Sequence, residues 1–253
     1  MAAPPEVTVV IPALDEAALL GAAIESVRAE AEVVVVDGGS SDGTRAVAVS
    51  AGARLLTTRA CRGLQLAEGA RSASGRWLVF LHADTRLERG WRQALDRVPA
   101  DAVGGAFRFA VDSPRPRYRA LEAAVALRCR ILRLPYGDQA IFVRRSAYRD
   151  VGGFPPLPLL EDVAFIRRLA GVGPLAFPPQ RAFTSARRWE RRGLVSTTLR
   201  NWCLLALYAS GWRPRVLAGP DDPSAARVAR GIGRRAGVTT PTDGRSTVAT
   251  GGR

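Results

Sequence analysis

The first half of the chain alternates short apolar runs with segments that carry apolar residues at helical spacing. Four runs rich in β-branched or other apolar residues predict strands covered on both faces, at 7–11, 33–36, 54–57 and 77–81. Between them the pattern predicts helices over 19–27, 44–50 and 64–72. Strands that alternate with helices at this spacing indicate an α/β fold with a parallel, doubly wound sheet and right-handed crossovers.

The second half follows a less regular pattern. Further helices are predicted over 88–98, 118–134, 162–169 and 192–212, and further strands over 105–111 and 140–143. From about residue 219 the chain turns to Gly, Pro, Ser, Thr, Ala and Arg with few large apolar groups. Such a composition cannot offset the entropy lost on ordering, so we expect one catalytic domain over 1–218 and a disordered tail over 219–253.

Candidate chemistry lies in the polar residues that follow the strands, because ligands of such sheets bind beyond the carboxyl ends of the strands. Glu16 and Asp37 each follow a predicted strand and can accept hydrogen bonds from a base or a ribose hydroxyl. His82 and Asp84 follow the fourth strand, and Asp84 has the hard oxygen ligands that suit Mg²⁺ or Mn²⁺. Each position is also typical of an ordinary turn or helix cap, so none of them decides the function alone.

Two later segments have the same double interpretation. Glu161 and Asp162 open a predicted helix, where the helix dipole favours acidic residues, yet one of them could serve as a general base. Four arginines surround Trp189, in the segment from Arg187 to Arg192. Their planar guanidinium groups could bind phosphate or could face solvent.

Charge and cysteine content limit the classes of binding partner and the cellular compartment that we expect. The net charge is +14, all 37 positive charges are arginine, and the first 50 residues carry −6 while the rest carry +20. A basic excess attracts a nucleoside diphosphate, a nucleic acid or an acidic membrane, but a uniformly basic nucleic-acid coat does not have this asymmetry. Three widely spaced cysteines favour a reduced, cytoplasmic setting, and we expect neither a signal peptide nor a transmembrane segment.

The C-terminal third suggests a membrane contact. From Arg181 onward the chain has a net charge of +10 beside an apolar helix face that includes Trp202 and Trp212. An interfacial helix needs this combination, so peripheral contact with the inner membrane face is one hypothesis. The alternative is a helix packed on the catalytic domain with solvated arginines.

Taken in order, these segments resemble the inverting family-2 glycosyltransferases of GT-A fold, from Val7 to about Trp212. The matching pieces are the Pro12 to Glu16 loop, Asp37-Gly-Gly-Ser-Ser-Asp-Gly-Thr, His82-Ala-Asp84 in place of an aspartate-x-aspartate motif, Gly152-Gly-Phe, and Glu161-Asp162. A narrower resemblance is to the radical-SAM/selenodomain-associated transferase 2 subgroup, also labelled arsenosugar-biosynthesis glycosyltransferases. The segments that carry it are Tyr136-Gly-Asp138-Gln139-Ala-Ile-Phe and Ser185-Ala-Arg187-Arg188-Trp189.

The resemblance implies a nucleotide-binding half over 1–85, an acceptor half over 86–218 and a role for each matching residue. The nucleoside, usually uridine, would be held by Pro12, Glu16 and Asp37. Asp84 would bind Mg²⁺ or Mn²⁺ on the donor diphosphate, although His82 replaces the first motif aspartate. Asp162 would be the catalytic base with Glu161 as its companion. The substrates would also be contacted by Arg188, Trp189, Asp138 and Gln139.

The implied reaction moves a sugar from a nucleoside diphosphate sugar, UDP-linked, to a small-molecule or lipid-linked hydroxyl with inversion, as in a hexosyltransferase; no nucleic acid takes part. One alternative is a nucleotidyltransferase of similar fold, which usually has a glycine-rich, Lys/Arg-containing signature where this chain has Pro-Ala-Leu-Asp-Glu. Another is a non-enzymatic basic module for nucleic acid or membranes. That module would explain the charge but not the acidic strand ends.

Overall fold

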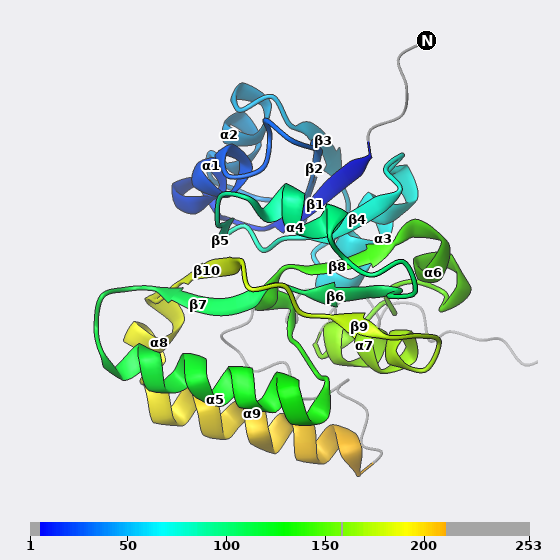
Figure 1. Cartoon of the computed structure of the whole chain (residues 1–253). Coiled ribbons are helices and arrows are strands. Elements are labelled where there is room, and N and C mark those ends of the chain that lie inside the picture. The colour runs from blue at the N-terminus through cyan, green and yellow to red at the C-terminus, as the bar shows by residue number, and fades with distance from the viewer. Residues whose placement is uncertain (1–5, 158, 211–253) are drawn as a thin grey trace, which may run out of the picture.

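Seven strands form the central sheet of the computed structural model, which describes residues 6–157 and 159–210. Their order is β3-β2-β1-β4-β8-β6-β9 (Figure 1). The strands are β1 (Val7–Ala13), β2 (Glu32–Asp37), β3 (Arg54–Thr57), β4 (Trp77–Phe80), β6 (Gly104–Ala106), β8 (Ile141–Arg144) and β9 (Leu175–Ala176). Only β8 runs antiparallel to its neighbours in this sheet. The predicted α/β fold with a mostly parallel sheet is confirmed.

Helices cover both faces of this sheet. One face is covered by α1 (Ala17–Glu25), α2 (Thr44–Ser50) and α4 (Trp91–Asp96), and the other by α3 (Arg62–Ser72), α6 (Arg145–Asp150) and α7 (Glu161–Ala170). Successive strand residues point to opposite faces, so Val9 packs in the cluster of Leu20 while Val10 packs in the cluster of Leu66. Burial on both faces explains why the strands are continuous apolar runs.

A second, three-stranded sheet in the order β5-β10-β7 lies beside the first. It consists of β5 (Thr85–Leu87), β7 (Arg108–Asp112) and β10 (Arg181–Ser185). The remaining elements are α5 (Arg117–Leu132), the 3-10 helix η1 (Gly137–Gln139), α8 (Arg187–Arg192) and α9 (Leu194–Ala209). Figure 1 shows α5 and α9 along one edge of the molecule, at the opposite end from α1 and α2.

The second half departs from the prediction in several places: β5, α6, β9, β10 and α8 were not predicted, and two predicted elements differ from the structure. The single strand predicted over 105–111 is wrong, because the chain leaves the first sheet after β6 and enters the second sheet at β7. Phe107, fully buried between them, donates its N–H to the Gln139 carbonyl at 2.9 Å. The helix predicted over 88–98 is shorter, because β5 pairs with β10 and Gly90 turns the chain at a φ of 82°. The predicted tail and Trp212 lie outside the described residues.

Close packing of α3 on the sheet gives a first testable prediction, for Gly69→Ala. A Cβ at Gly69 would lie 2.3 Å from Val10 Cγ1 and 3.0 Å from Val36 Cγ2. Both neighbours are stiff, β-branched side chains, so overpacking should cost about 1–3 kcal/mol. That exceeds the roughly 1 kcal/mol of helix propensity that alanine adds. Urea denaturation should therefore show a less stable protein.

The matched control is Gly21→Ala on α1. There a new Cβ would meet only Val47 Cγ1, at the ordinary distance of 3.6 Å. The propensity gain should then appear as a protein more stable by up to about 1 kcal/mol. If both substitutions changed stability equally, the close approach at Gly69 would not explain its effect.

Candidate active site

Three strand ends meet at one edge of the large sheet. Ala13 pairs with Asp37, and Val10 pairs with Phe80, both in parallel register. The loops after β1, β2 and β4 therefore gather Glu16, Asp37 and Asp84 at the edge where such sheets bind ligands. The second sheet closes this edge, because the Ser185 N–H donates to the Asp84 carbonyl at 3.0 Å and so brings α8 alongside.

A cavity of about 740 Å³ opens at this edge, within the usual size of ligand sites. Four of the residues predicted for the site line it: Glu16, Asp138, Asp162 and Arg188. Other polar and charged residues that line it are Arg62, His82, Tyr136, Arg192, Ser196, Thr197, Arg200 and Asn201. The cavity thus combines acidic side chains with four arginines, as a site for a charged substrate requires.

Asp162 is buried in the first turn of α7 with its carboxylate fixed at both oxygens. The Gly137 N–H donates to Oδ2 at 2.7 Å, and the Val163 N–H donates to Oδ1 at 2.7 Å. Leu160 precedes the helix in a left-handed conformation, with a φ of 60°, which is strained for a residue other than glycine. This turn presents Asp162 to the cavity. Each carboxylate oxygen can still accept one more hydrogen bond.

Glu161, the neighbouring acid, is fully buried and points elsewhere. Its Oε1 accepts a hydrogen bond from the Arg62 guanidinium on α3. Burial raises the pKa of the Glu161 carboxyl, and Arg62 opposes that rise. The pair joins α3 to α7, so Glu161 positions the helix that carries Asp162.

This pair gives a second prediction, for Arg62→Ala. Loss of the guanidinium strands the Glu161 carboxylate in the interior, which should cost about 3 kcal/mol at pH 8. The folded-state pKa of Glu161 already lies above its ordinary value and should rise further without Arg62. A group with a raised folded-state pKa destabilises the folded state as pH rises and it loses its proton. Glu161 is more often protonated at pH 5 than at pH 8, so Arg62→Ala should cost less stability at pH 5. Denaturant unfolding at both pH values measures the difference.

Arg71→Ala is the matched control on the same helix. Arg71 pairs with Glu68 at the surface and its side chain is 73% exposed. Solvent screens that pair, so stability should stay nearly unchanged at either pH. A cost at Arg62 that did not depend on pH would contradict a stranded carboxylate as its cause.

Arg187 was one of four arginines that the sequence grouped around Trp189, with no role of its own, and it lies between two of the predicted acids. Its guanidinium hydrogen-bonds Glu16 Oε1, and its Nη2 lies 3.5 Å from Asp84 Oδ2. Burial raises the pKa of Glu16, and Arg187 opposes that rise. The second Glu16 oxygen, Oε2, is buried with no hydrogen-bond partner among the described residues. It can therefore accept a hydrogen bond from a hydroxyl group of a ligand.

Asp37 ends β2 as a buried, ionised carboxylate. It accepts the N–H groups of Gly39 and Ser40, the Ser40 hydroxyl, and Arg45 Nε at 2.7 Å. Burial raises its pKa, but these hydrogen bonds outweigh burial and lower it overall. A bound nucleobase would have to share the Asp37 carboxylate oxygens with these hydrogen-bond donors. Pro12, also predicted for the nucleoside, is buried within β1 opposite Val36.

The loops after β1 and β2 are locked together by polar contacts. The Glu16 N–H donates to Thr44 Oγ1 at 2.8 Å, and the Ser41 N–H donates to Asp15 Oδ1 at 2.7 Å. Asp42 accepts the Thr44 N–H at 2.9 Å, although the N-cap of α2 is Gly43. Glu16 and Asp37 therefore lie on one preformed unit.

Two further ionisable groups border the cavity. Burial, together with the cations Arg62 and Arg188, holds the pKa of His82 well below its ordinary value. Burial raises the pKa of Asp138, while Arg188 and Arg128 oppose that rise. The pKa of Asp138 therefore lies above that of a surface aspartate.

Gln139 and Trp189, both predicted to contact substrate, lie beneath the cavity wall. Gln139 is buried; its Nε2 donates to the Phe107 carbonyl at 3.2 Å and its Oε1 accepts Arg128 Nη2 at 3.1 Å. Trp189 is buried edge-on against Phe109, with ring centroids 5.9 Å apart. Neither side chain lines the large cavity.

The donor set at Asp84 fits a cation that is shared with a substrate. In the part of the chain that the structure describes, no three His, Cys, Asp or Glu residues are grouped to hold a metal. Mg²⁺ is usually held by one or two carboxylates together with substrate phosphates, and Asp84 supplies one such carboxylate. Arg187, 3.5 Å from that carboxylate, would have to withdraw from it.

Comparison with known proteins adds three findings. No curated protein sequence matches the chain. Among solved structures, S. aureus TarS 1–349 is 16% identical with a TM-score of 0.57, covering 72% of this chain and 60% of its own. Glucosyl-3-phosphoglycerate synthase from Mycobacterium tuberculosis, in complex with Mn²⁺ and UDP-glucose, is 20% identical with a TM-score of 0.53, covering 69% of each chain. These likenesses show a shared fold, and this chain spans about 60% of the TarS 1–349 chain.

Family membership follows from the sequence match. The sequence model of the family described as "Glycosyl transferase family 2" matches residues 8–154, which is more than half of the chain. The matched range contains the strand-end loops with Glu16, Asp37 and Asp84, and it ends just before α7. The chain therefore belongs to glycosyl transferase family 2.

Proposed function

We propose that this glycosyltransferase moves a sugar from a nucleoside diphosphate sugar, UDP-linked, to a hydroxyl acceptor with inversion. The observation that carries the proposal is the cavity that Asp162 shares with Glu16 and Arg188 at the carboxyl edge of the sheet. TarS has been crystallised with UDP-GlcNAc, and the mycobacterial synthase with UDP-glucose. Those complexes support a UDP-linked donor for this chain.

Asp162 is the general base of the proposed reaction. Its carboxylate accepts the proton of the acceptor hydroxyl as the hydroxyl oxygen attacks the anomeric carbon. The bond from that carbon to the diphosphate oxygen breaks on the opposite face, and its electrons leave with the diphosphate. A single displacement of this kind inverts the anomeric configuration. The hydrogen bond from Gly137 keeps Asp162 oriented throughout.

Arginines at the cavity stabilise the departing diphosphate. Arg188 lines the cavity, and its planar donors suit phosphate oxygens. Asp84 would hold Mg²⁺ or Mn²⁺ together with the diphosphate, and that cation would neutralise charge on the leaving group. The mycobacterial synthase structures, which contain Mn²⁺ or Mg²⁺, support this cofactor class.

Nucleoside and acceptor would occupy different parts of the site. Glu16 has an unpartnered Oε2 for a ribose hydroxyl, beside Asp37 and Pro12 on the base side. Asp138 faces the acceptor part of the cavity, while Gln139 and Trp189 support its wall. The acceptor is a small-molecule or lipid-linked hydroxyl, and the narrower subgroup resemblance favours a small molecule. A cytoplasmic setting agrees with three unpaired cysteines.

A thermal-shift screen of nucleoside diphosphates and sugar nucleotides with Mn²⁺ tests the proposal. We expect UDP and one or more UDP-sugars to raise the melting temperature, because ligands that bind only the folded state stabilise it. The best donor then enters product analysis with candidate acceptors. No shift with any nucleotide, combined with binding to nucleic acid, would instead favour the non-enzymatic basic module.

A further inference from the structure

Helices α5 and α9 carry large apolar side chains that face away from the rest of the protein. On α5, Leu127 and Ile131 are 57% and 66% exposed. On α9, Val195, Leu199 and Trp202 are 70%, 59% and 54% exposed. Isolated exposed apolar residues are common on protein surfaces, but several on two adjacent helices call for an explanation.

The exposed side chains form a stripe on each helix. Leu127 and Ile131 are one turn apart on the side of α5 opposite the buried Tyr118 and Cys129, and three exposed alanines lie near them: Ala120, Ala123 and Ala124. On α9, the exposed residues Val195, Leu199, Trp202 and Ala206 lie opposite the buried Thr197 and Leu204. Each helix is therefore apolar on the outside as well as on the inside.

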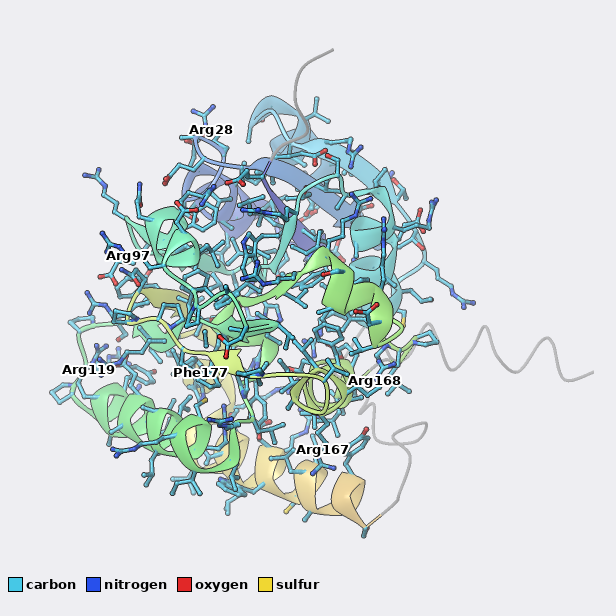
Figure 2. The ribbon with its side chains drawn as sticks, turned by 45° about the vertical axis from the view of Figure 1, so that its right-hand side comes forward. Arg28, Arg97, Arg119, Arg167, Arg168 and Phe177 are labelled. Carbon is cyan, nitrogen blue, oxygen red and sulfur yellow. The ribbon has the colours of Figure 1, made fainter. Side chains whose placement is uncertain are left out.

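The two stripes point the same way. Between the helices lies a narrow cavity lined by Val125 and Arg128 of α5 and by Thr198 and Trp202 of α9, so the two helices lie side by side and Trp202 is at the border of its stripe nearest α5. Figures 1 and 2 both show them together at the edge of the molecule. Arg167 of α7, labelled in Figure 2, lies 5.5 Å from the Tyr208 ring and supports the inner side of α9. We call the combined outer surface of Leu127, Ile131, Val195, Leu199 and Trp202 the α5–α9 face.

Positive charge borders this face and negative charge is scarce. Arg119 and Arg130 are exposed along α5, Arg133 is exposed just after it, and Arg200 is exposed on α9, where it also lines the large cavity. The sequence of α9 contains no Asp or Glu, and that of α5 contains only Glu122, which is mostly buried and paired with Arg119 at 3.0 Å. An apolar stripe bordered by arginine is the pattern of a helix that lies in a membrane interface.

We propose that the α5–α9 face docks on an anionic lipid bilayer, with the apolar stripe against the acyl boundary and the arginines on the headgroups. A second copy of the chain fits this face less well, because a twofold contact would set the same arginines against each other. Within residues 6–157 and 159–210, no helix has the length and apolar content to cross a bilayer. Thr197 and Leu204, on the inner side of α9, line the large cavity, so docking holds that cavity beside the membrane.

The test is co-sedimentation of the full chain with vesicles of phosphatidylcholine alone or with 30% phosphatidylglycerol. We expect binding to the anionic vesicles that weakens as salt is raised, and little binding to the neutral ones. The double variant Leu127→Glu, Leu199→Glu should reduce vesicle partitioning by on the order of tenfold or more, because both apolar anchors become like-charged with the headgroups.

A matched control keeps the result specific to this face. Val49→Glu with Val172→Glu adds the same two charges at exposed apolar positions elsewhere, at 62% and 53% exposure, and should bind like the parent. Equal loss in both double variants, or no loss in the first, would overturn the proposal. A change in oligomeric state of the first variant, with no vesicle binding by the parent, would show instead that a second copy covers the face. The assay uses no nucleotide, so its outcome is independent of the proposed reaction.

Discussion

Asp162→Asn should lower the rate of sugar transfer by roughly 10²–10⁴-fold, the contribution expected of a positioned general base. Asparagine has nearly the same shape but cannot take the acceptor proton. The nucleotide affinity should change little, because the donor is assigned to Glu16, Asp37, Asp84 and Arg188. Steady-state turnover with the best donor, next to calorimetric titration of UDP, separates the two quantities.

Two controls accompany this variant. An Asn amide can accept only one of the two backbone N–H groups that Asp162 accepts, so thermal melting must show that the variant is folded. Asp101→Asn removes a carboxylate at an exposed position that does not line the large cavity, and it should leave turnover unchanged. Near-normal turnover by Asp162→Asn would remove Asp162 from the role of base.

Asp84→Asn should weaken UDP binding in the presence of Mn²⁺ by about 10-fold to 100-fold, because it removes the carboxylate that we assign to the cation. In the parent, UDP should bind more tightly with Mn²⁺ than with a chelator. In the variant, the two titration curves should coincide.

Asp112→Asn is the matched control for Asp84. Asp112 also pairs with an arginine, Arg86 at 2.7 Å, but on the exposed edge of the second sheet. Its loss should leave both UDP titrations as in the parent. Coinciding titrations in the parent itself, with and without Mn²⁺, would refute a cation at Asp84.

Local sequence pattern was sufficient for the parts of the fold that depend on local chemistry. The first, second and fourth strands are apolar because both faces are buried, and their ends fix where Glu16, Asp37 and Asp84 lie. The Glu161-Asp162 pair opens a helix as predicted. These features depend on neighbours in sequence and on strand order, which a pattern of apolar residues records.

What the pattern did not predict depends on contacts between distant segments. Arg187 meets Glu16 across 171 positions, and Arg62 meets Glu161 across 99. The switch of the chain between sheets at Phe107 likewise depends on pairing with β10, which follows much later. A run of arginines gives no local signal of which member faces an acid, so only the fold distinguishes Arg187 from its neighbours.

The same limit applies to Gln139 and Trp189. Their residue types are typical of substrate contacts, yet both side chains are used in packing beneath the cavity. Burial of a polar side chain with satisfied hydrogen bonds cannot be distinguished from a binding role by composition alone. For the apolar outer surface of α5 and α9, the sequence predicted an apolar face only for the helix that became α9. The structure adds the exposed apolar residues of α5 beside it.

The central claim is transfer of a sugar with release of a nucleoside diphosphate, and ³¹P NMR of the wild-type protein with Mn²⁺ and the best nucleotide sugar tests it most directly. The predicted spectrum shows the donor signals replaced by those of the nucleoside diphosphate, slowly with water as acceptor and faster with the true acceptor. That result places the cleavage between the sugar and the diphosphate, and formation of a glycoside with the acceptor assigns it to the bond at the anomeric carbon. Appearance of a nucleoside monophosphate with a sugar 1-phosphate, or of a nucleoside triphosphate with a sugar 1-phosphate when pyrophosphate is added as in the reverse reaction of a nucleotidyltransferase, would instead show cleavage within the diphosphate and would contradict the proposed function.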